Sequence, residues 1–124
     1  MQNNGESIQL SASDLVGHLN CHHLTGLDIA VANGELVRPK IWDPLLDLLV
    51  ERGALHEKAY LDHLTASGFK PVLIEGVGIN PTAVAQTLDA MKAGAQIIAQ
   101  GVLESGRWSG RADVLKRVEK PSRF

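Results

Sequence analysis

The fold class is decided by residues 69–118, which read FKPVLIEGVGINPTAVAQTLDAMKAGAQIIAQGVLESGRWSGRADVLKRV. Residues 69–75 are mostly apolar and stand ahead of a glycine-rich turn, which predicts a strand. Asn80 and Pro81 then supply a helix cap and a first-turn proline, so a helix is expected from there to Gly94. This stretch predicts a strand followed directly by a helix.

Two more strand-like runs follow this helix. Residues 96–103 and 108–118 flank the turn sequence ESGR at 104–107, which predicts an antiparallel hairpin. A small sheet that ends at Val118 leaves an open edge, and compact domains normally pair or cover such an edge. The sequence therefore predicts an incomplete domain, with the next strand expected where the tail 119–124 lies.

The residues before the sheet are predicted to be helical. Ser11 and Asp14 resemble a capping box, and apolar residues recur at helical spacing up to the Asn-Gly pair at 33–34. This region is expected to form one helix, or two helices joined near Cys21. Residues 43–68 begin with Asp-Pro and end with glycine, which predicts a second, long helical region.

These elements predict an α/β protein of α+β type, with N-terminal helices packed on a small mixed sheet. The chain has 124 residues, of which 44% are hydrophobic and 21% charged, as expected for one globular domain. Residues 1–9 are predicted to be a flexible N-terminus and residues 10–118 to form one unit.

Charge and cysteine content exclude several classes of protein. The formal net charge is −2, so no global field attracts DNA or anionic lipid, and any nucleic-acid contact must be local. One cysteine excludes an internal disulfide framework and favours the cytoplasm. No segment resembles a signal peptide or a membrane span, so no membrane partner is expected.

His56 is a candidate for chemistry within the long helix. Helical residues advance by about 100°, which places His56 among Leu45, Leu49 and Tyr60 and predicts that it points inward. Two interpretations remain open. The residue is either a core histidine bonded to a carbonyl group, or a metal ligand or general base.

Asp113 is the second candidate, because aspartate is unfavourable in a strand-like run and costly to bury without a partner. It either faces the surface and pairs with Arg111 or Arg117, or it is a ligand of a divalent cation. Strand periodicity does not decide between these interpretations.

Histidines near Cys21 suggest a metal site only weakly. Cys21, His22 and His23 are adjacent, so in a helix their side chains diverge. His18 and His22 are four residues apart, but no acid stands between them as in helical zinc-protease motifs. The sequence GVG at 76–78 lacks the spacing of a phosphate-binding loop and is interpreted as a turn.

Four segments together resemble a known family. They are LSASDLVGHLNCHHLTGLDIAVANGE near the start, ERGALHEKAYLDHL, TLDAMKAGAQIIAQGVL, and GRWSGRADVLKRVEKPSRF at the end. In this order they resemble the N-terminal part of RecB-family nucleases. These proteins are related to the CRISPR-associated RecB-like exonucleases of the PD-(D/E)xK superfamily. The resemblance covers nearly the whole chain and implies an incomplete restriction-endonuclease-like core.

The resemblance implies roles for three residues. GALH at 53–56 matches a helical motif whose histidine binds metal, and GRAD at 110–113 matches a strand motif whose aspartate binds the same ion. His56 and Asp113 are thus implied to bind Mg²⁺ or Mn²⁺ and to be catalytic. Cys21 matches a cysteine that, in several related nucleases, joins three C-terminal cysteines around a 4Fe-4S cluster. Those three cysteines are absent from this sequence.

The sequence also departs from the family at the active site. The family's next strand carries an Asp/Glu-x-Lys motif, and none is found here, because Glu119 and Lys120 are adjacent and Lys116 lies three residues from Asp113. The resemblance therefore implies a fragment of a metal-dependent DNA nuclease that is inactive alone. The alternative is a non-catalytic helical binding or assembly module, with an apolar partner site along residues 108–118.

A DNA partner would also need positive charge near the site. The basic residues in this region form a local cluster on a mildly acidic chain, and they either contact phosphates or belong to a solvated hairpin and tail. The candidates for nucleic-acid binding are Arg107, Arg111, Lys116 and Arg117, followed by Lys120 and Arg123 in the tail.

Overall fold

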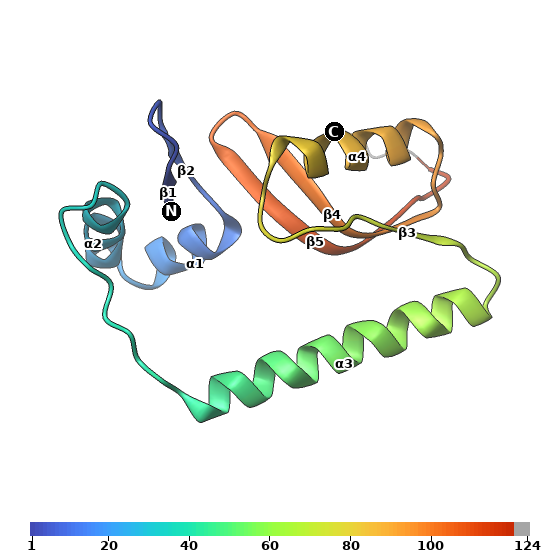
Figure 1. Cartoon of the computed structure of the whole chain (residues 1–124), viewed down its shortest axis with the longest axis horizontal. Helices are drawn as coiled ribbons and strands as arrows, with labels where there is room; N and C mark the ends of the chain where they lie inside the picture. The colour runs from blue at the N-terminus through green and yellow to red at the C-terminus, as the bar shows by residue number, and fades with distance from the viewer. Residues whose placement is uncertain (121–124) are drawn as a thin grey trace. The chain divides into compact units, whose positions relative to one another are not determined.

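The computed structural model describes residues 1–120, and within them the protein is an α+β fold, as predicted (Figure 1). A short antiparallel pair of strands precedes the first three helices, and a mixed three-stranded sheet in the order β3-β4-β5 follows them, with α4 between β3 and β4 in the chain. The elements are β1 Gln2–Asn3, β2 Ile8–Gln9, α1 Ala12–Asn20, α2 His22–Ala32, α3 Pro44–Ala66, β3 Pro71–Leu73, α4 Pro81–Lys92, β4 Ile97–Ser105 and β5 Trp108–Lys116.

Contacts between residues divide the chain into two compact units. Unit 1 comprises Met1–Trp42 together with Glu104–Gly110, which is the tip of the β4-β5 hairpin. Unit 2 comprises Asp43–Leu103 and the chain from Arg111 onward. The sequence predicted one partial nuclease domain over residues 10–118, and this remains a prediction.

Unit 1 contains two helices because the chain is extended at Cys21. This residue has φ −157° and ψ 105°, so it ends α1 and caps α2. The second of the two sequence-based alternatives, two helices joined near Cys21, is therefore confirmed. Gly34, with φ +77°, ends α2 in a conformation that glycine adopts without strain.

The first ten residues form short-range β structure that the sequence did not predict. Gln2 pairs with Gln9 and Asn3 with Ile8 in the β1-β2 hairpin. Leu10 then bridges to Trp108 in parallel, with its amide 2.7 Å from the Arg107 carbonyl oxygen. The chain entering α1 is thus tied to the tip of the β4-β5 hairpin.

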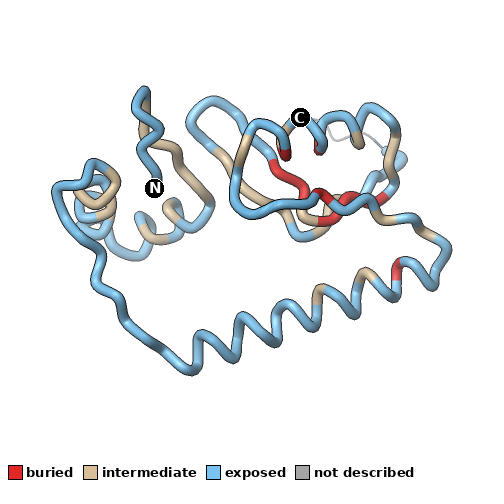
Figure 2. The backbone as a smooth tube through the Cα atoms, in the orientation of Figure 1, coloured by how far each residue is buried: buried red, intermediate tan, exposed pale blue. Residues whose placement is uncertain are grey.

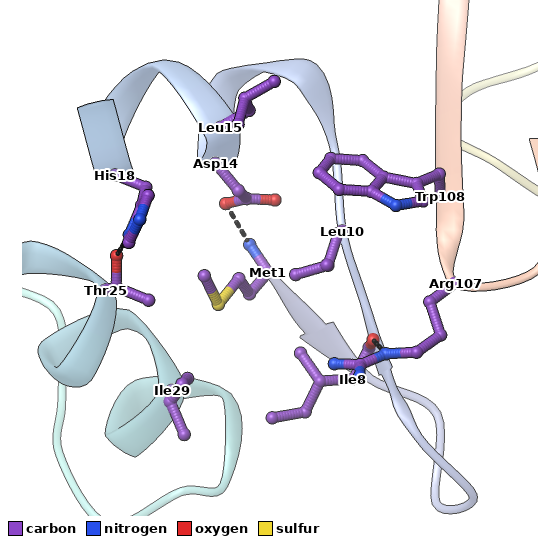
Figure 3. Close-up of a pocket in the computed structure, with 10 residues that line it drawn as sticks. All are labelled: Met1, Ile8, Leu10, Asp14, Leu15, His18, Thr25, Ile29, Arg107 and Trp108. Atoms are coloured by element: carbon purple, nitrogen blue, oxygen red, sulfur yellow. Dashed lines mark hydrogen bonds and ion pairs between the residues drawn. The ribbon is translucent and has the colours of Figure 1, made fainter. Parts of the chain in front are cut away.

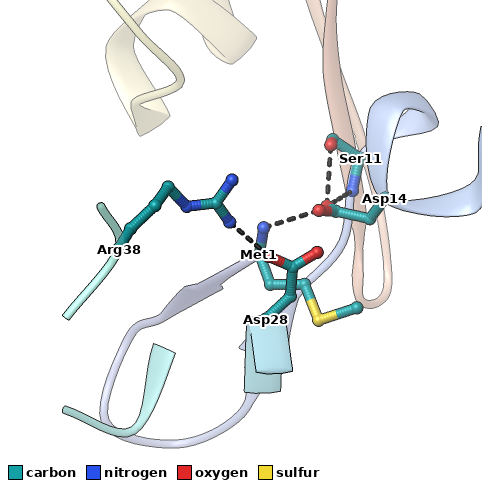
Figure 4. A network of polar contacts seen from close by, with 5 residues as sticks. All are labelled: Met1, Ser11, Asp14, Asp28 and Arg38. Atoms are coloured by element: carbon teal, nitrogen blue, oxygen red, sulfur yellow. Dashed lines mark hydrogen bonds and ion pairs between the residues drawn. The ribbon is translucent and has the colours of Figure 1, made fainter. Parts of the chain in front are cut away.

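Asp14 organises the start of α1 (Figure 4). Its carboxylate accepts hydrogen bonds of 2.7 Å from the Met1 ammonium group, the Ser11 amide and the Ser11 hydroxyl. Burial alone would raise the pKa of Asp14, but these hydrogen bonds outweigh it and hold the pKa below its ordinary value. The predicted capping box is present, and an ion pair joins Asp28 to Arg38 in the same unit.

In unit 2, α3 begins and ends as predicted. The Asp43 side chain accepts a hydrogen bond from the Leu45 amide at 2.9 Å, Pro44 occupies the first turn, and Gly68 follows the end with φ +90°. Burial along α3 is confined to Leu64 near its C-terminal end. Leu45 and Leu49, which the helical pattern placed on an inward face, are 62% and 58% exposed.

The core of unit 2 lies between the sheet and α4 (Figure 2). β3 pairs in parallel with β4, Val72 opposite Ile98, and α4 connects them. Ile74, Ala83, Ile98 and Val102 form the buried centre. Thr87 is completely buried there, donating to the Ala83 carbonyl group at 2.8 Å and accepting from the Val102 amide at 2.9 Å.

Strand bounds differ modestly from the predicted ones. β3 is confined to Pro71–Leu73, and β4 continues to Ser105, so the hairpin turn is Gly106 and Arg107 rather than four residues. Gly106 has φ +57°, the conformation that tight two-residue turns require at their first position. The part of the predicted tail at 121–124 lies outside the described residues.

Candidate functional site

His56 of α3 and Asp113 of β5, far apart in the sequence, line the same pocket of about 520 Å³ in unit 2. Residues 50–60 of α3, about three helical turns, supply most of the wall, and β5 supplies the rest. The remaining lining residues are Val50, Gly53, Ala54, Glu57, Tyr60 and Val114. The two residues singled out for metal binding therefore face a common space.

The side chain of His56 is exposed, so the inward orientation predicted from the helical wheel is wrong. The wheel assumes that the apolar face of α3 is covered along its length, whereas the structure buries only Leu64. Exposure removes the interpretation of His56 as a core histidine. A histidine at the wall of an open pocket is accessible to a ligand.

Asp113 is exposed and has no ion pair with Arg111 or Arg117 among residues 1–120. The guanidinium groups of both arginines are directed to backbone carbonyl groups instead. Because Asp113 is exposed, water solvates its carboxylate, and the charge in β5 does not need a cation from the chain to compensate it. Its carboxylate is free to take a ligand.

The described residues do not complete a metal site. Within residues 1–120 no three His, Cys, Asp or Glu side chains come together in a way that could hold an ion. Glu57 lines the same pocket, but its Oε1 accepts a hydrogen bond from Gln100 Nε2 at 2.5 Å. Binding of Mg²⁺ or Mn²⁺ by His56 and Asp113 remains a prediction, and the other positions of such a site would need groups outside this set.

The guanidinium group of Arg111, a candidate for DNA binding, already makes hydrogen bonds within unit 2. Its Nη2 donates to the Gly78 carbonyl oxygen at 2.7 Å, and its Nη1 donates to those of Ile74 and Gln100 at 3.4 and 3.3 Å. These bonds tie β5 to β4 and to the loop after β3. Contact of Arg111 with DNA remains a prediction, and it would compete with these internal bonds.

The other three basic candidates are placed differently from one another. In unit 1, Arg107 Nε donates to the Ile8 carbonyl oxygen at 3.2 Å. In unit 2, Lys116 Nζ lies 5.0 Å above the Phe69 ring, and Arg117 Nη1 is 3.4 Å from the Gly94 carbonyl oxygen. All but Arg111 are exposed, so their charges remain accessible to phosphates.

Cys21 is exposed between α1 and α2. It is the single cysteine of the sequence, so residues 1–124 do not supply four thiolates for a 4Fe-4S cluster. The nearby His18 and His22 rings are stacked, 4.4 Å apart at 15°. Stacked rings direct their in-plane nitrogen lone pairs along parallel planes, so this arrangement does not place both on one ion.

The sequence did not predict the hydrogen bond between Gln100 and Glu57 beside the pocket. Gln100 carries no recognisable motif, although its side chain bonds to Glu57 and its backbone has φ +57°. Glu57 stands next to His56, but its neighbour in the sheet is more than forty residues away in the chain. Only the adjacency of Glu57 to His56 was visible in the sequence.

Unit 1 contains a second pocket, of about 290 Å³ (Figure 3). Ile8, Leu10, Leu15 and Trp108 give it apolar walls, and the Asp14 carboxylate bonded to the Met1 ammonium group lies at its edge. The sequence did not predict this pocket, because Met1 and Ile8 in its wall come from the segment predicted to be a flexible end, and Arg107 comes from the predicted hairpin turn.

Among residues 1–120, no helix has both the length and the apolar character to cross a bilayer. Comparison with protein-family models, with curated proteins and with solved structures found no match for this chain.

Proposed function

We propose that this chain carries part of the metal site of a RecB-like, metal-dependent DNA nuclease, and that residues 1–124 do not hydrolyse DNA alone. The observation that supports the proposal is the shared pocket of His56 and Asp113. Both residues stand in motifs that resemble those of the family, GALH at 53–56 and GRAD at 110–113. A chance pair on α3 and β5 would have no reason to line one pocket.

The inactivity follows from what the sequence lacks. None of the acidic residues is followed two positions later by lysine, so the family's Asp/Glu-x-Lys motif is absent from residues 1–124. The lysine of that motif orients water and stabilises charge on the phosphate, and the acid supplies a metal ligand. Two protein ligands without these groups bind Mg²⁺ weakly, because the ion gives up its waters reluctantly.

Manganese-induced line broadening in NMR spectra tests the site directly. We expect Mn²⁺ to broaden the signals of His56 and Asp113 before all others, and excess Mg²⁺ to reverse the effect. His56→Ala or Asp113→Asn abolishes this selectivity. His63→Ala and Asp62→Asn are matched controls, because both residues are exposed on the same helix and neither lines the pocket.

Incubation of the purified chain with plasmid DNA and Mg²⁺ or Mn²⁺ tests the second part of the proposal. No cleavage is expected. Cleavage that disappears in Asp113→Asn would refute the predicted inactivity while supporting the site. Broadening that is uniform, or that persists in both His56→Ala and Asp113→Asn, would refute the metal site itself.

A non-catalytic binding or assembly module is the second candidate, and one observation favours it. Much of the N-terminal half of α3 is apolar and more than half exposed, at Leu45, Leu46, Leu49 and Val50. Apolar surface of this kind is typical of a helix that packs against a partner. Self-association in sedimentation that is lost in Leu46→Glu and Leu49→Glu, together with no selective Mn²⁺ effect, would favour the module.

A further inference from the structure

Gln100 has the one unusual backbone conformation among the non-glycine residues of the described chain. Its φ is +57°, in the left-handed region, although it lies inside β4. A residue with a Cβ atom adopts this conformation at an energetic cost, and it persists only where surrounding contacts enforce it. Such positions concentrate at functional sites.

Contacts on both sides hold Gln100 in this conformation. Its carbonyl oxygen accepts a hydrogen bond from Arg111 Nη1 at 3.3 Å, and Arg111 also donates to Ile74 and Gly78. Its side-chain Nε2 donates to Glu57 Oε1 at 2.5 Å. The side-chain amide of Gln100 thus reaches Glu57 of α3 from within β4.

The Gln100–Glu57 bond ties the sheet to α3 at the pocket itself. Glu57 follows His56 directly and lines the same wall. Elsewhere α3 is poorly anchored, since its one buried residue is Leu64, two turns further along. The position of His56 relative to Asp113 therefore depends on the link between Glu57 and Gln100.

We propose that Gln100 is a positioning residue that, through Glu57, holds His56 of α3 facing Asp113 of β5 across the shared pocket. For metal binding this rests on the proposed function, but the geometric role does not depend on an ion. Hydrogen-bonded partners behind metal ligands are known to fix ligand orientation and commonly change affinity by about 10–100-fold when removed.

Gln100→Gly is the decisive variant. Glycine adopts a positive φ without strain, so the backbone of β4 is retained while the bond to Glu57 is lost. Gln96→Gly is the control, because Gln96 is exposed just before β4 and makes no side-chain bond to α3. Glu57→Gln should behave like the wild type, since its amide oxygen still accepts from Gln100, whereas Glu57→Ala should behave like Gln100→Gly.

Two NMR readouts are measured on each variant after circular dichroism shows that it is folded. The first uses no metal, and records how far Asp113→Asn shifts the ring signals of His56. We expect a clear shift in the wild-type, Gln96→Gly and Glu57→Gln backgrounds, and its loss with Gln100→Gly and Glu57→Ala. The second is the Mn²⁺ concentration that broadens the His56 signals, expected to rise about 10-fold in those two variants.

The outcomes separate the two proposals. If Mn²⁺ never acts selectively at His56, the metal site is refuted, and the ring signals still decide the role of Gln100. The positioning role is overturned if Asp113→Asn leaves the wild-type His56 ring signals unmoved. It is equally overturned if Gln100→Gly preserves the shift caused by Asp113→Asn.

Discussion

The completely buried Thr87 gives the sharpest prediction for stability. Its hydroxyl bridges α4 and β4 by donating to the Ala83 carbonyl group and accepting from the Val102 amide. Thr87→Val replaces the hydroxyl with a methyl group of nearly the same size, so the shape of the core is retained. The Val102 amide, on a residue with no exposed surface, then has no partner.

The expected magnitude follows from two opposing terms. An unsatisfied buried amide costs about 1–3 kcal/mol. The added methyl group returns about 0.8 kcal/mol through burial. We therefore expect the free energy of unfolding to fall by about 0.2–2.2 kcal/mol, which lowers a urea midpoint by roughly 0.1–1.1 M at a slope of about 2 kcal/mol/M.

Urea unfolding followed by circular dichroism measures this change, and amide hydrogen exchange reports Val102 itself. Thr65→Val is the matched control. Thr65 makes the same bond to the carbonyl group four residues earlier, Leu61 at 2.9 Å, but it is exposed and accepts no bond from a strand. The reasoning is refuted if both variants unfold at the wild-type urea concentration, or if the Val102 amide remains as protected as before.

Two further predictions concern Asp14 and Arg111. The pKa of Asp14 is lowered in the folded protein, so the ionised carboxylate stabilises the fold above the unfolded pKa of 3.8, and this stabilisation is lost as the pH falls through the folded pKa. We expect Asp14→Asn to remove this acid-dependent loss of stability, which is measured as the free energy of unfolding from about pH 5 downward. Arg111→Met removes the hydrogen-bond donor of three carbonyl groups and should lower the free energy of unfolding by about 1.5–3 kcal/mol. Arg117→Met removes one long, exposed hydrogen bond and should change that free energy by less than about 1 kcal/mol. Equal effects of the two variants in chemical unfolding would contradict this ranking.

Local signals in the sequence predicted most elements of the fold. Asn80 and Pro81 begin α4 because the Asn80 side chain accepts from the Ala83 amide at 2.9 Å and proline needs no hydrogen-bond partner in the first turn. Asp43 and Pro44 do the same for α3. The β1 and β2 strands were missed because strands of two residues are too short to show a period.

Burial was harder to predict than element type. Leu88 and Met91 follow the helical period of α4 with Val84, yet they are 45% and 41% exposed, because the sheet beneath has three strands and covers little of the helix. Periodicity shows which side of a helix is apolar. The extent of cover over that side depends on how many strands and helices the fold places against it.

For the candidate site, the sequence could predict the identity of residues but not the contacts between residues that are distant in the chain. His56 and Asp113 were identified from residue type and motif, and their shared pocket required the spatial arrangement of α3 and β5. Gln100 could not be identified, because a positive φ in glutamine has no sequence signature. Its hydrogen-bond partners Arg111 and Glu57 come from other elements, so they could not be inferred from the local sequence.

The assignment of Glu104–Gly110 to unit 1 has a consequence for folding during synthesis. The helices of unit 1 leave the ribosome early, but Arg107, which bonds to the Ile8 carbonyl group, is made 99 residues after it. Unit 1 therefore cannot close until β4 and the hairpin turn have emerged. Contacts of such long sequence separation form slowly, so the contacts that close unit 1 are among the last to form in the described chain.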